Sequence, residues 1–478
     1  MGKKVEKSKF EVLKEKVSHD FKNAWEELKE GEKELVFSYS DDYKNFLDAG
    51  KTERECTDEI IRLAKEKDYV DVDNIIKNGT KILPGMKLYA NNRGKSIILF
   101  VIGKEDIASG MNIVGGHIDS PRIDLKPFPL YEDSNMAFLK THYYGGIKKY
   151  QWTAMPLSMH GVLINRAGEK IEISIGEDPS DPIFFITDLL PHLGKDQHAK
   201  TLGDGITGEG LNILVGNMPY GDKDTKDKVK LNALRILNEK YGIVEEDFTT
   251  AEIEIVPAGK ARDVGFDRSL ISAYGHDDRV CSFAGVKAIL EVEGPTMTSV
   301  GMFMDKEEVG SMGNTGSESK YFENIVAELI ALQTENYNDL YIRRSLSNSK
   351  VLSADVCAGY DPNYAEAYDK RNSGMIGHGV QLVKYTGSRG KGGCNDANAE
   401  FASEVRNVFS DAGVVWQVGE LGKVDQGGGG TIAYILANAG AEVIDCGVPM
   451  LSMHAPYEIV SKVDAYMTFK AYKAFLDR

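Results

Sequence analysis

Histidines and acids in this 478-residue sequence gather at the ends of short apolar segments that are typical of buried β-strands. Each stands just after such a segment or at the start of a helix-like one: His117 and Asp119 after 112–116, Glu307 and Glu308 after 300–304, Asp355 after 351–354, His454 beyond 442–446, and Asp277 with Asp278 at the start of 278–292. Imidazole nitrogens and carboxylate oxygens are ligands for Zn²⁺, Mn²⁺ and Co²⁺ in proteins. The pattern therefore favours a site for divalent metal ions.

Taken singly, each of these residues also has an ordinary interpretation. A lone histidine after a strand is commonly structural, paired glutamates commonly form a solvated face, and Asp277-Asp278-Arg279 could be a helix N-cap with a neighbouring ion pair. Their joint placement favours the metal site, because the carboxyl ends of strands in an open α/β sheet meet at one edge. Two metal ions would need a shared carboxylate and at least two further ligands each, and these residues are numerous enough to supply them.

The elements that must position these residues form an α/β pattern in the C-terminal half. After Asp263, helical and strand segments alternate, with helices expected at 278–292, 319–334, 397–411, 431–439 and 457–476, and strands at 299–304, 351–354, 414–418 and 441–446. This alternation predicts a mixed, mostly parallel sheet flanked by helices.

The rest of the chain divides into two stretches. The first 70 residues predict helices, one over 21–35 and another opened by a capping box at Thr52 and Glu55, and strands follow at 96–103 and 111–116. From about 123 to 262 the sequence is punctuated by glycine and proline. Alternating runs at 171–175 and 252–256 predict half-buried antiparallel strands there, and 221–230 predicts a solvated loop.

Composition narrows the classes of function. Asp and Glu outnumber Lys and Arg by 73 to 57, a net charge of −16, which argues against a nucleic-acid binder. The longest apolar stretch, 97–102, is too short to span a bilayer, and no apolar run follows the N-terminal lysines as in a secretory signal. Five scattered cysteines without a CxxC pair indicate reduced thiols and a cytoplasmic protein. Neither HExxH nor GxSxG occurs.

Four segments resemble the motifs of the M18 family of metalloaminopeptidases, the family of aspartyl aminopeptidase. They are Gly115-Gly-His-Ile-Asp-Ser-Pro-Arg122, Asp305-Lys-Glu-Glu-Val-Gly-Ser311, Leu352-Ser-Ala-Asp-Val356 with Asp361-Pro-Asn-Tyr364, and Pro449-Met-Leu-Ser-Met-His454. They keep the family's order and extend across most of the chain. The resemblance implies a peptide hydrolase that removes N-terminal residues from short peptides.

The resemblance also implies a role for each site residue. Asp277 would bridge two divalent metal ions, most simply Zn²⁺, although the ligand types also admit Co²⁺ and Mn²⁺. His117 and Asp355 would complete one metal site, and Glu308 and His454 the other. Glu307 would be the general base that takes a proton from the attacking water. Asp119 would lie behind His117 and hold its tautomer, the usual part of a carboxylate behind a metal-binding imidazole.

The family's architecture supplies further expectations. A catalytic domain would come from 1–122 and 263–478, and 123–262 would be an inserted β-rich dimerisation domain. Dimers would assemble into a tetrahedral dodecamer whose enclosed active sites admit only short, unfolded peptides. His192 matches a histidine that reaches a neighbouring subunit's active site, although a plain surface histidine is an equal alternative. No nucleic acid or membrane is expected as a partner.

Alternatives remain open from the sequence. A related metal-dependent deacetylase or carboxypeptidase would use a similar site on blocked or C-terminal amides. A non-catalytic assembly protein could keep the same fold. The glycine runs 387–393 and 427–430 depart from the acid-preferring eukaryotic branch of the family, so which N-terminal residue is preferred stays open. The run 427–430 could bind an anion such as a substrate carboxylate, or it could form a flexible pocket wall.

Overall fold

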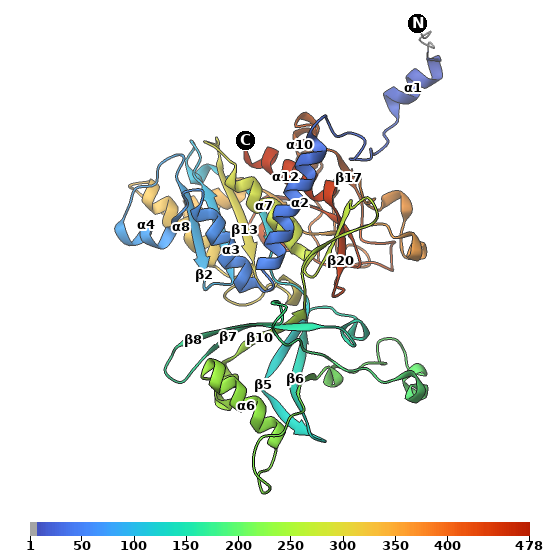
Figure 1. Ribbon diagram of the computed structural model, residues 1–478. Helices are drawn as coiled ribbons and strands as arrows, with labels where there is room; N and C mark the ends of the chain where they lie inside the picture. The colour runs from blue at the N-terminus through green and yellow to red at the C-terminus, as the bar shows by residue number, and fades with distance from the viewer. Residues whose placement is uncertain (1–6) are drawn as a thin grey trace.

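A computed structural model describes residues 7–478, which form two parts joined one above the other (Figure 1). The upper part is a layered body of helices and strands from both ends of the chain, and the lower part is built mainly of β-strands from its middle. Helix α1 (Lys9–Val17) extends away from the upper part, and all its residues are exposed.

The upper part is organised around a nine-stranded sheet. In order across the sheet its strands are β1 (Val70–Asp71), β2 (Lys87–Asn92), β3 (Ser96–Val101), β13 (Thr298–Met304), β4 (Met111–His117), β14 (Lys350–Ser353), β18 (Glu442–Gly447), β16 (Val380–Val383) and β17 (Trp416–Val418). The central strands β13, β4, β14 and β18 are parallel, whereas β3 is antiparallel to β2 and β13, and β16 is antiparallel to β18 but parallel to β17. The predicted mixed, mostly parallel α/β fold is confirmed.

Helices cover both faces of this sheet because its strands are apolar on both sides. In β3, Ile97 and Leu99 belong to one buried cluster, while Ile98 and Phe100 belong to another on the opposite face. The first cluster is closed by α2 (Glu32–Ala49), α3 (Glu53–Lys65), α7 (His276–Leu290), α10 (Ala399–Asp411) and α12 (Lys462–Leu476). The second is closed by α4 (Val72–Asn78), α8 (Tyr321–Gln333), α9 (Leu340–Asn348) and α11 (Ala433–Asn438).

The lower part has its own sheet and core. Its six strands are, in order, β8 (Lys170–Ile175), β7 (Leu157–Ile164), β10 (Glu252–Pro257), β5 (Arg122–Asp133), β6 (Met136–Tyr144) and β9 (Ile213–Gly216). All paired neighbours are antiparallel, as predicted for 171–175 and 252–256. The sheet packs its own cluster around Trp152. The domain boundaries at 122/123 and 262/263 stay predictions.

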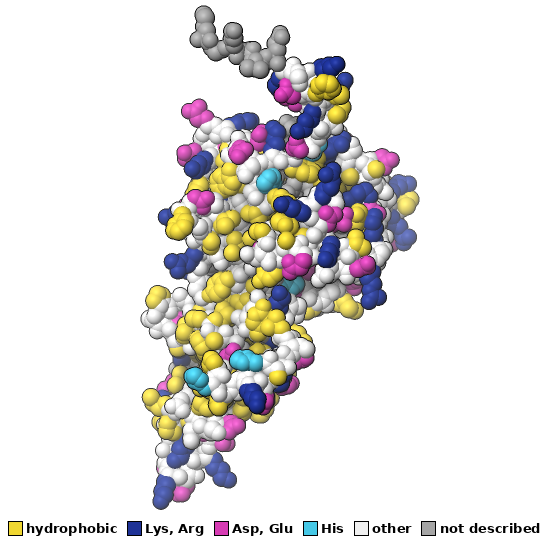
Figure 2. Space-filling view, turned by 90° about the vertical axis from the view of Figure 1, so that its right-hand side faces the viewer, with side chains coloured by type: hydrophobic (Ala, Val, Ile, Leu, Met, Phe, Trp, Pro, Cys, Tyr) yellow, Lys and Arg dark blue, Asp and Glu magenta, His cyan; other side chains and the backbone are white. Residues whose placement is uncertain are grey.

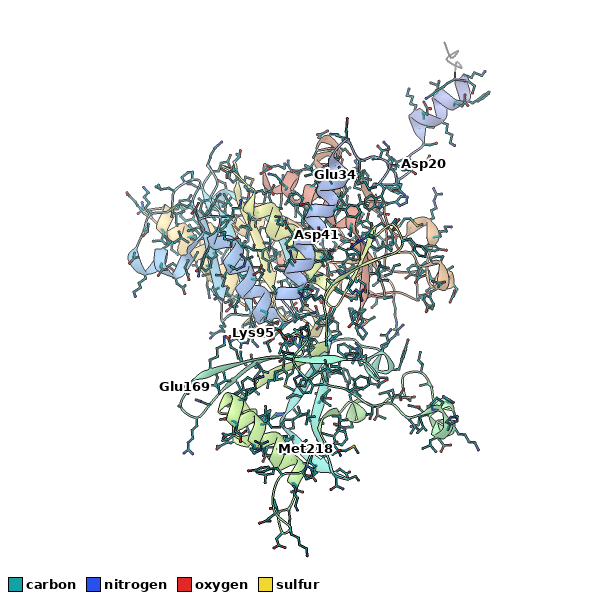
Figure 3. The ribbon with its side chains drawn as sticks, in the orientation of Figure 1. Asp20, Glu34, Asp41, Lys95, Glu169 and Met218 are labelled. Atoms are coloured by element: carbon teal, nitrogen blue, oxygen red, sulfur yellow. The ribbon has the colours of Figure 1, made fainter. Side chains whose placement is uncertain are left out.

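Ion pairs link the two parts where they meet. Lys95, labelled in Figure 3 at this junction, lies 2.9 Å from Glu252 of β10. Arg122, at the start of β5, pairs with Glu53 of α3 at 3.3 Å and with Glu254 of β10 at 3.1 Å. Because Arg122 and Glu53 are almost fully buried, these contacts fix the lower sheet against α3.

A third, five-stranded sheet completes the upper part. Its order is β11 (Arg262–Val264), β12 (Leu270–Ala273), β20 (Glu458–Ser461), β19 (Pro449–Leu451) and β15 (Cys357–Ala358). The helix predicted over 457–476 was therefore wrong at its start, because Glu458–Ser461 pairs with β12 and α12 begins only at Lys462.

Two other details differ from the sequence predictions. The helix predicted over 21–35 was wrong: the chain makes turns until α2 begins at Glu32, because the Ala24 N–H bonds to the Gly377 carbonyl at 2.7 Å. The segment 221–230 is a loop only in part, since α6 (Lys228–Tyr241) starts inside it. The capping box at Thr52 and Glu55 is confirmed as the start of α3.

The cysteines carry free thiols, and Cys56, Cys281, Cys357 and Cys446 are buried. Across residues 7–478, no helix combines the length and the apolar character needed to cross a membrane.

Candidate metal centre

The site begins at the carboxyl ends of three adjacent parallel strands. His117 is the last residue of β4, opposite Met304 at the end of β13. Glu307 and Glu308 follow β13 in a short 3-10 turn, and Asp355 follows β14 by two residues. Because these strands are neighbours and parallel, their ends bring the side chains together, as the sequence predicts.

Asp277 lies between the two histidines. It enters from the N-terminal end of α7, and its Oδ1 lies 3.2 Å from His117 Nε2 while its Oδ2 lies 3.2 Å from His454 Nε2. His454 comes from the loop between β19 and β20 and also lies 3.5 Å from Glu308 Oε2. The opposite edges of one carboxylate thus face two different imidazoles.

These side chains form two donor sets that share Asp277. One set is His117, Asp277 and Asp355, and the other is Asp277, Glu308 and His454; within each, the candidate ligand atoms lie within 4.8 Å of one another. His117 also forms a third such set with Glu307 and Glu308. Imidazole and carboxylate donors at this spacing suit borderline divalent cations such as Zn²⁺.

The electrostatics of the site also fit cations. Burial and the neighbouring acids raise the pKa of Glu308 and of Asp355 well above the usual carboxyl value. Within residues 7–478, Glu308 Oε1 has no hydrogen-bond partner although it is buried. Buried carboxylates this close together are costly when ionised, and a positive ion between them removes that cost. The residues present therefore fit a divalent metal.

Hydrogen bonds orient both imidazoles with Nε2 toward Asp277. His117 Nδ1 lies 3.0 Å from the Asp119 carbonyl oxygen and 3.3 Å from its Oδ1. His454 Nδ1 lies 2.8 Å from the Gly146 carbonyl oxygen. Since a carbonyl can only accept, each Nδ1 carries a proton, and Nε2 is the nitrogen through which each imidazole would bind a metal ion.

Glu307 has the properties of a proton acceptor. It lines the cleft, and its Oε2 lies 4.0 Å from His117 Nε2. Burial and the charges of Asp119 and Asp277 raise the pKa of Glu307 to about 7, against the opposing effect of His117. A carboxyl with this pKa can both accept and release a proton near neutral pH.

The site opens into a cavity of about 950 Å³. Its walls include Gly428, Gly429 and Gly430, so the glycine run 427–430 forms part of the wall of the cavity. The structure places His192 in an exposed 3-10 turn (Pro191–Leu193) of the lower part. Within the described chain His192 does not line this cavity.

Sequence reasoning missed three residues that support the site: Tyr144, Gly146 and Glu458. Tyr144 ends β6 of the lower part and touches Asp119, and Gly146, two residues later, touches His454. A tyrosine followed by two glycines directly after an alternating strand was the available signal. His276, beside Asp277, bonds instead to Tyr43 Oη at 2.7 Å and to the Ile271 carbonyl at 3.2 Å, which is a core role.

The chain matches the family described as "Aminopeptidase I zinc metalloprotease (M18)" over residues 46–476. It is 52% identical over 458 residues to "Probable M18 family aminopeptidase 1" of Clostridium acetobutylicum, covering 96% of this chain and 98% of that protein. The crystal structure of an M18-family aminopeptidase from Thermotoga maritima superposes with a TM-score of 0.92 at 45% identity, covering 96% of this chain and all of the other. A dodecamer of mApe1 from Saccharomyces cerevisiae, 20% identical, shares the fold with a TM-score of 0.73, covering 91% of this chain and 95% of that one.

Proposed function

Because the chain belongs to the M18 family of zinc metalloproteases and is a metal-dependent aminopeptidase, we propose that it removes the N-terminal residue from short peptides with two divalent ions and Glu307 as general base. The observation that carries this proposal is the position of Asp277 between His117 and His454. A carboxylate shared between two donor sets is the requirement for a co-catalytic pair of ions.

The two donor sets assign the ligands. His117 and Asp355 would hold one ion and Glu308 and His454 the other, with Asp277 shared between them. Zn²⁺ is the expected metal, and Co²⁺ or Mn²⁺ suit the same ligands. When bound, such ions acidify water and polarise the scissile carbonyl.

The protein's own residues then manage protons and geometry. Glu307 takes a proton from the attacking water at its carboxylate and delivers it to the nitrogen of the leaving amine. Without metal ions its pKa is about 7, and bound cations would favour the ionised form that accepts the proton. Asp119 holds His117 through its carbonyl oxygen, which accepts from His117 Nδ1 at 3.0 Å, and holds the backbone of Glu307 through its carboxylate, which accepts the Glu307 N–H at 3.1 Å.

We also propose that copies of this chain associate with one another. Hydrophobic side chains gather over the lower part on the face shown in Figure 2. Four of the most exposed apolar side chains of the 123–262 segment are Phe128, Leu193, Leu202 and Met218. Patches of this kind mark protein contacts. We propose a dimer that assembles further into a tetrahedral dodecamer, with His192 reaching a neighbouring active site; the dodecamer of the mApe1 relative supports assembly into twelve subunits.

The test is hydrolysis of a panel of short peptides, each with its N-terminus free or acetylated, with Zn²⁺, Co²⁺ or Mn²⁺ and again with chelator. Cleavage of the free forms only, lost with chelator, is expected. The order of rates for N-terminal Asp, Glu, Leu and Lys gives the specificity. Preference for acetylated peptides would instead indicate a deacetylase on the same metal site.

A further inference from the structure

The lower sheet reaches into the metal centre through one short segment. We infer that Tyr144, Gly145 and Gly146, which end β6 and follow it, form a positioning strap that sets the geometry of the site, with Tyr144 as its anchor. The Tyr144 hydroxyl donates to Asp119 Oδ2 at 2.8 Å, and the Gly146 carbonyl accepts from His454 Nδ1 at 2.8 Å. This inference rests on the proposed function of Asp119 and His454.

Asp119 carries the effect of Tyr144 to both glutamates. The Asp119 side chain is fully buried; its Oδ1 accepts the Glu307 N–H at 3.1 Å, and its Oδ2 accepts the Glu308 N–H at 3.2 Å. The Tyr144 hydroxyl is therefore the third donor to one carboxylate. If that donor is removed, the carboxylate can rotate and both backbone contacts shift with it.

Tyr144 is itself fixed to the junction of the two parts. Its ring lies under the Arg122 guanidinium, 3.9 Å from the centroid to the carbon, and Arg122 pairs with Glu53 of the upper part and Glu254 of the lower. Burial and the charge of Asp119 raise the pKa of Tyr144, so its hydroxyl remains a proton donor. The strap thus connects the lower sheet rigidly to Asp119.

The two glycines let the strap lie close to the ligands. A Cβ on Gly145 would lie 3.3 Å from Glu308 Cβ, and Gly145 has a φ of +72°, which favours glycine. A Cβ on Gly146 would lie 3.3 Å from His454 Nδ1. Side chains at either position would push Glu308 or His454 away from Asp277.

The test compares Tyr144→Phe with Tyr143→Phe in the full-length protein. Tyr143 is the neighbouring residue of β6 and is 41% exposed, so it offers the same chemical change outside the strap. Zn²⁺ affinity is measured by competition with a chromophoric chelator, kcat and KM with a free peptide, and folding by thermal melting. Tyr144→Phe is expected to lose ~10-fold or more in Zn²⁺ affinity and in kcat, with KM nearly unchanged, as for other groups that orient metal ligands. Tyr143→Phe is expected to match the wild type.

Gly146→Ala provides a second variant with the hydroxyl intact. It is expected to weaken the binding of one ion more than the other, because only His454 is displaced. Wild-type Zn²⁺ affinity and kcat in both Tyr144→Phe and Gly146→Ala would overturn the inference. If the wild type binds Zn²⁺ but cleaves no free peptide, the proposed function fails, while the Zn²⁺ affinities of the variants still decide whether the strap positions the site.

Discussion

The Asp277 backbone N–H donates to Oε2 of Glu458 at 3.1 Å, so a second buried acid holds the residue at the centre of the site. Glu458 lies on β20, and its Oε1 accepts the His454 N–H at 2.7 Å. The two oxygens of one carboxylate therefore fix the backbone of two proposed ligands. Neither ligand is near the other in sequence, and Glu458 sets their separation.

Glu458→Gln is expected to lower Zn²⁺ affinity by ~10-fold or more, because an amide has one acceptor oxygen and turns its NH₂ toward the second N–H. The protein should also lose ~1–3 kcal/mol of stability, since a buried donor loses its partner. The matched control is Glu239→Gln, an exposed glutamate of α6 that pairs with Arg235. Equal chelator-competition curves for the two variants would contradict this role for Glu458.

Glu307→Gln is expected to keep the wild-type metal content and to lower kcat by ~10²–10⁴-fold, because the amide cannot accept the proton. In the wild type, kcat/KM should rise with pH as Glu307 ionises. Since its pKa is about 7 without metal, and bound cations favour the ionised form, the acid limb should lie at or below pH 7. The measurements are metal analysis and a pH–rate profile. Full activity in Glu307→Gln would refute the assignment.

Removing ligands should change the number of bound ions in a defined way. Asp277→Ala is expected to lose both ions, because both donor sets contain it. His117→Ala and His454→Ala should each lose one ion first, since each histidine belongs to only one of the two sets that share Asp277. Metal content after gel filtration is the measurement, with His19→Ala, an exposed histidine, as control. The same stoichiometry in Asp277→Ala and the control would rule out a shared carboxylate.

Much of this centre could be predicted from the sequence because its parts follow buried strands. All seven residues of β4 are buried, so its apolar pattern is clear and the polar residue that ends it, His117, is conspicuous. The same holds for β13, which precedes Glu307 and Glu308. For parallel neighbours, knowing where strands end is nearly enough to know which side chains meet.

The remaining features depend on contacts between distant segments, which local patterns do not encode. The Tyr144-Gly145-Gly146 run marks the end of a strand, but it does not indicate that β6 of the lower sheet ends against Asp119. The helix expected over 21–35 has suitable spacing, but Ala24 bonds to Gly377, far along the chain, instead of to its own turn. Likewise β20 is a strand because β12 supplies its partner. In these places tertiary pairing overrides local propensity.

Metal binding should release protons at neutral pH. Although burial opposes it, the hydrogen bond to Asp277 and the charge of Glu308 raise the pKa of His454 to about 10 in the metal-free protein. A cation can bind Nε2 only after this proton leaves, so affinity should rise as pH increases and fall as it decreases. Calorimetry of Zn²⁺ binding in buffers of different ionisation enthalpy counts the protons. An affinity that is equal at about pH 6 and about pH 8, with no proton released, would contradict the prediction.

Stability should depend on a single carboxylate that links three segments. Asp263 of β11 binds Lys462 of α12 at 2.8 Å and Lys44 of α2 at 2.9 Å through Oδ1, and Arg268 at 2.8 Å through Oδ2. Lys462 is only 1% exposed, so its charge depends on this partner. Asp263→Asn is therefore expected to cost ~3 kcal/mol at neutral pH, because a buried cation loses its anion.

The stabilisation by the Asp263 carboxylate should depend on pH. Burial raises the pKa of Asp263, but the hydrogen bonds from Lys462, Lys44 and Arg268 outweigh it and hold the pKa well below the usual value. A carboxylate with a lowered folded-state pKa stabilises the protein above the unfolded pKa of about 4, and the stabilisation is lost as pH falls below it. In denaturant melts, the free energies of unfolding of wild type and Asp263→Asn should differ most near neutral pH and converge below about pH 4. The control is Asp42→Asn, which removes the exposed pair with Lys287 and should cost under ~1 kcal/mol. A gap between wild type and Asp263→Asn that stays constant with pH would show that the variant acts by something other than the loss of this charge.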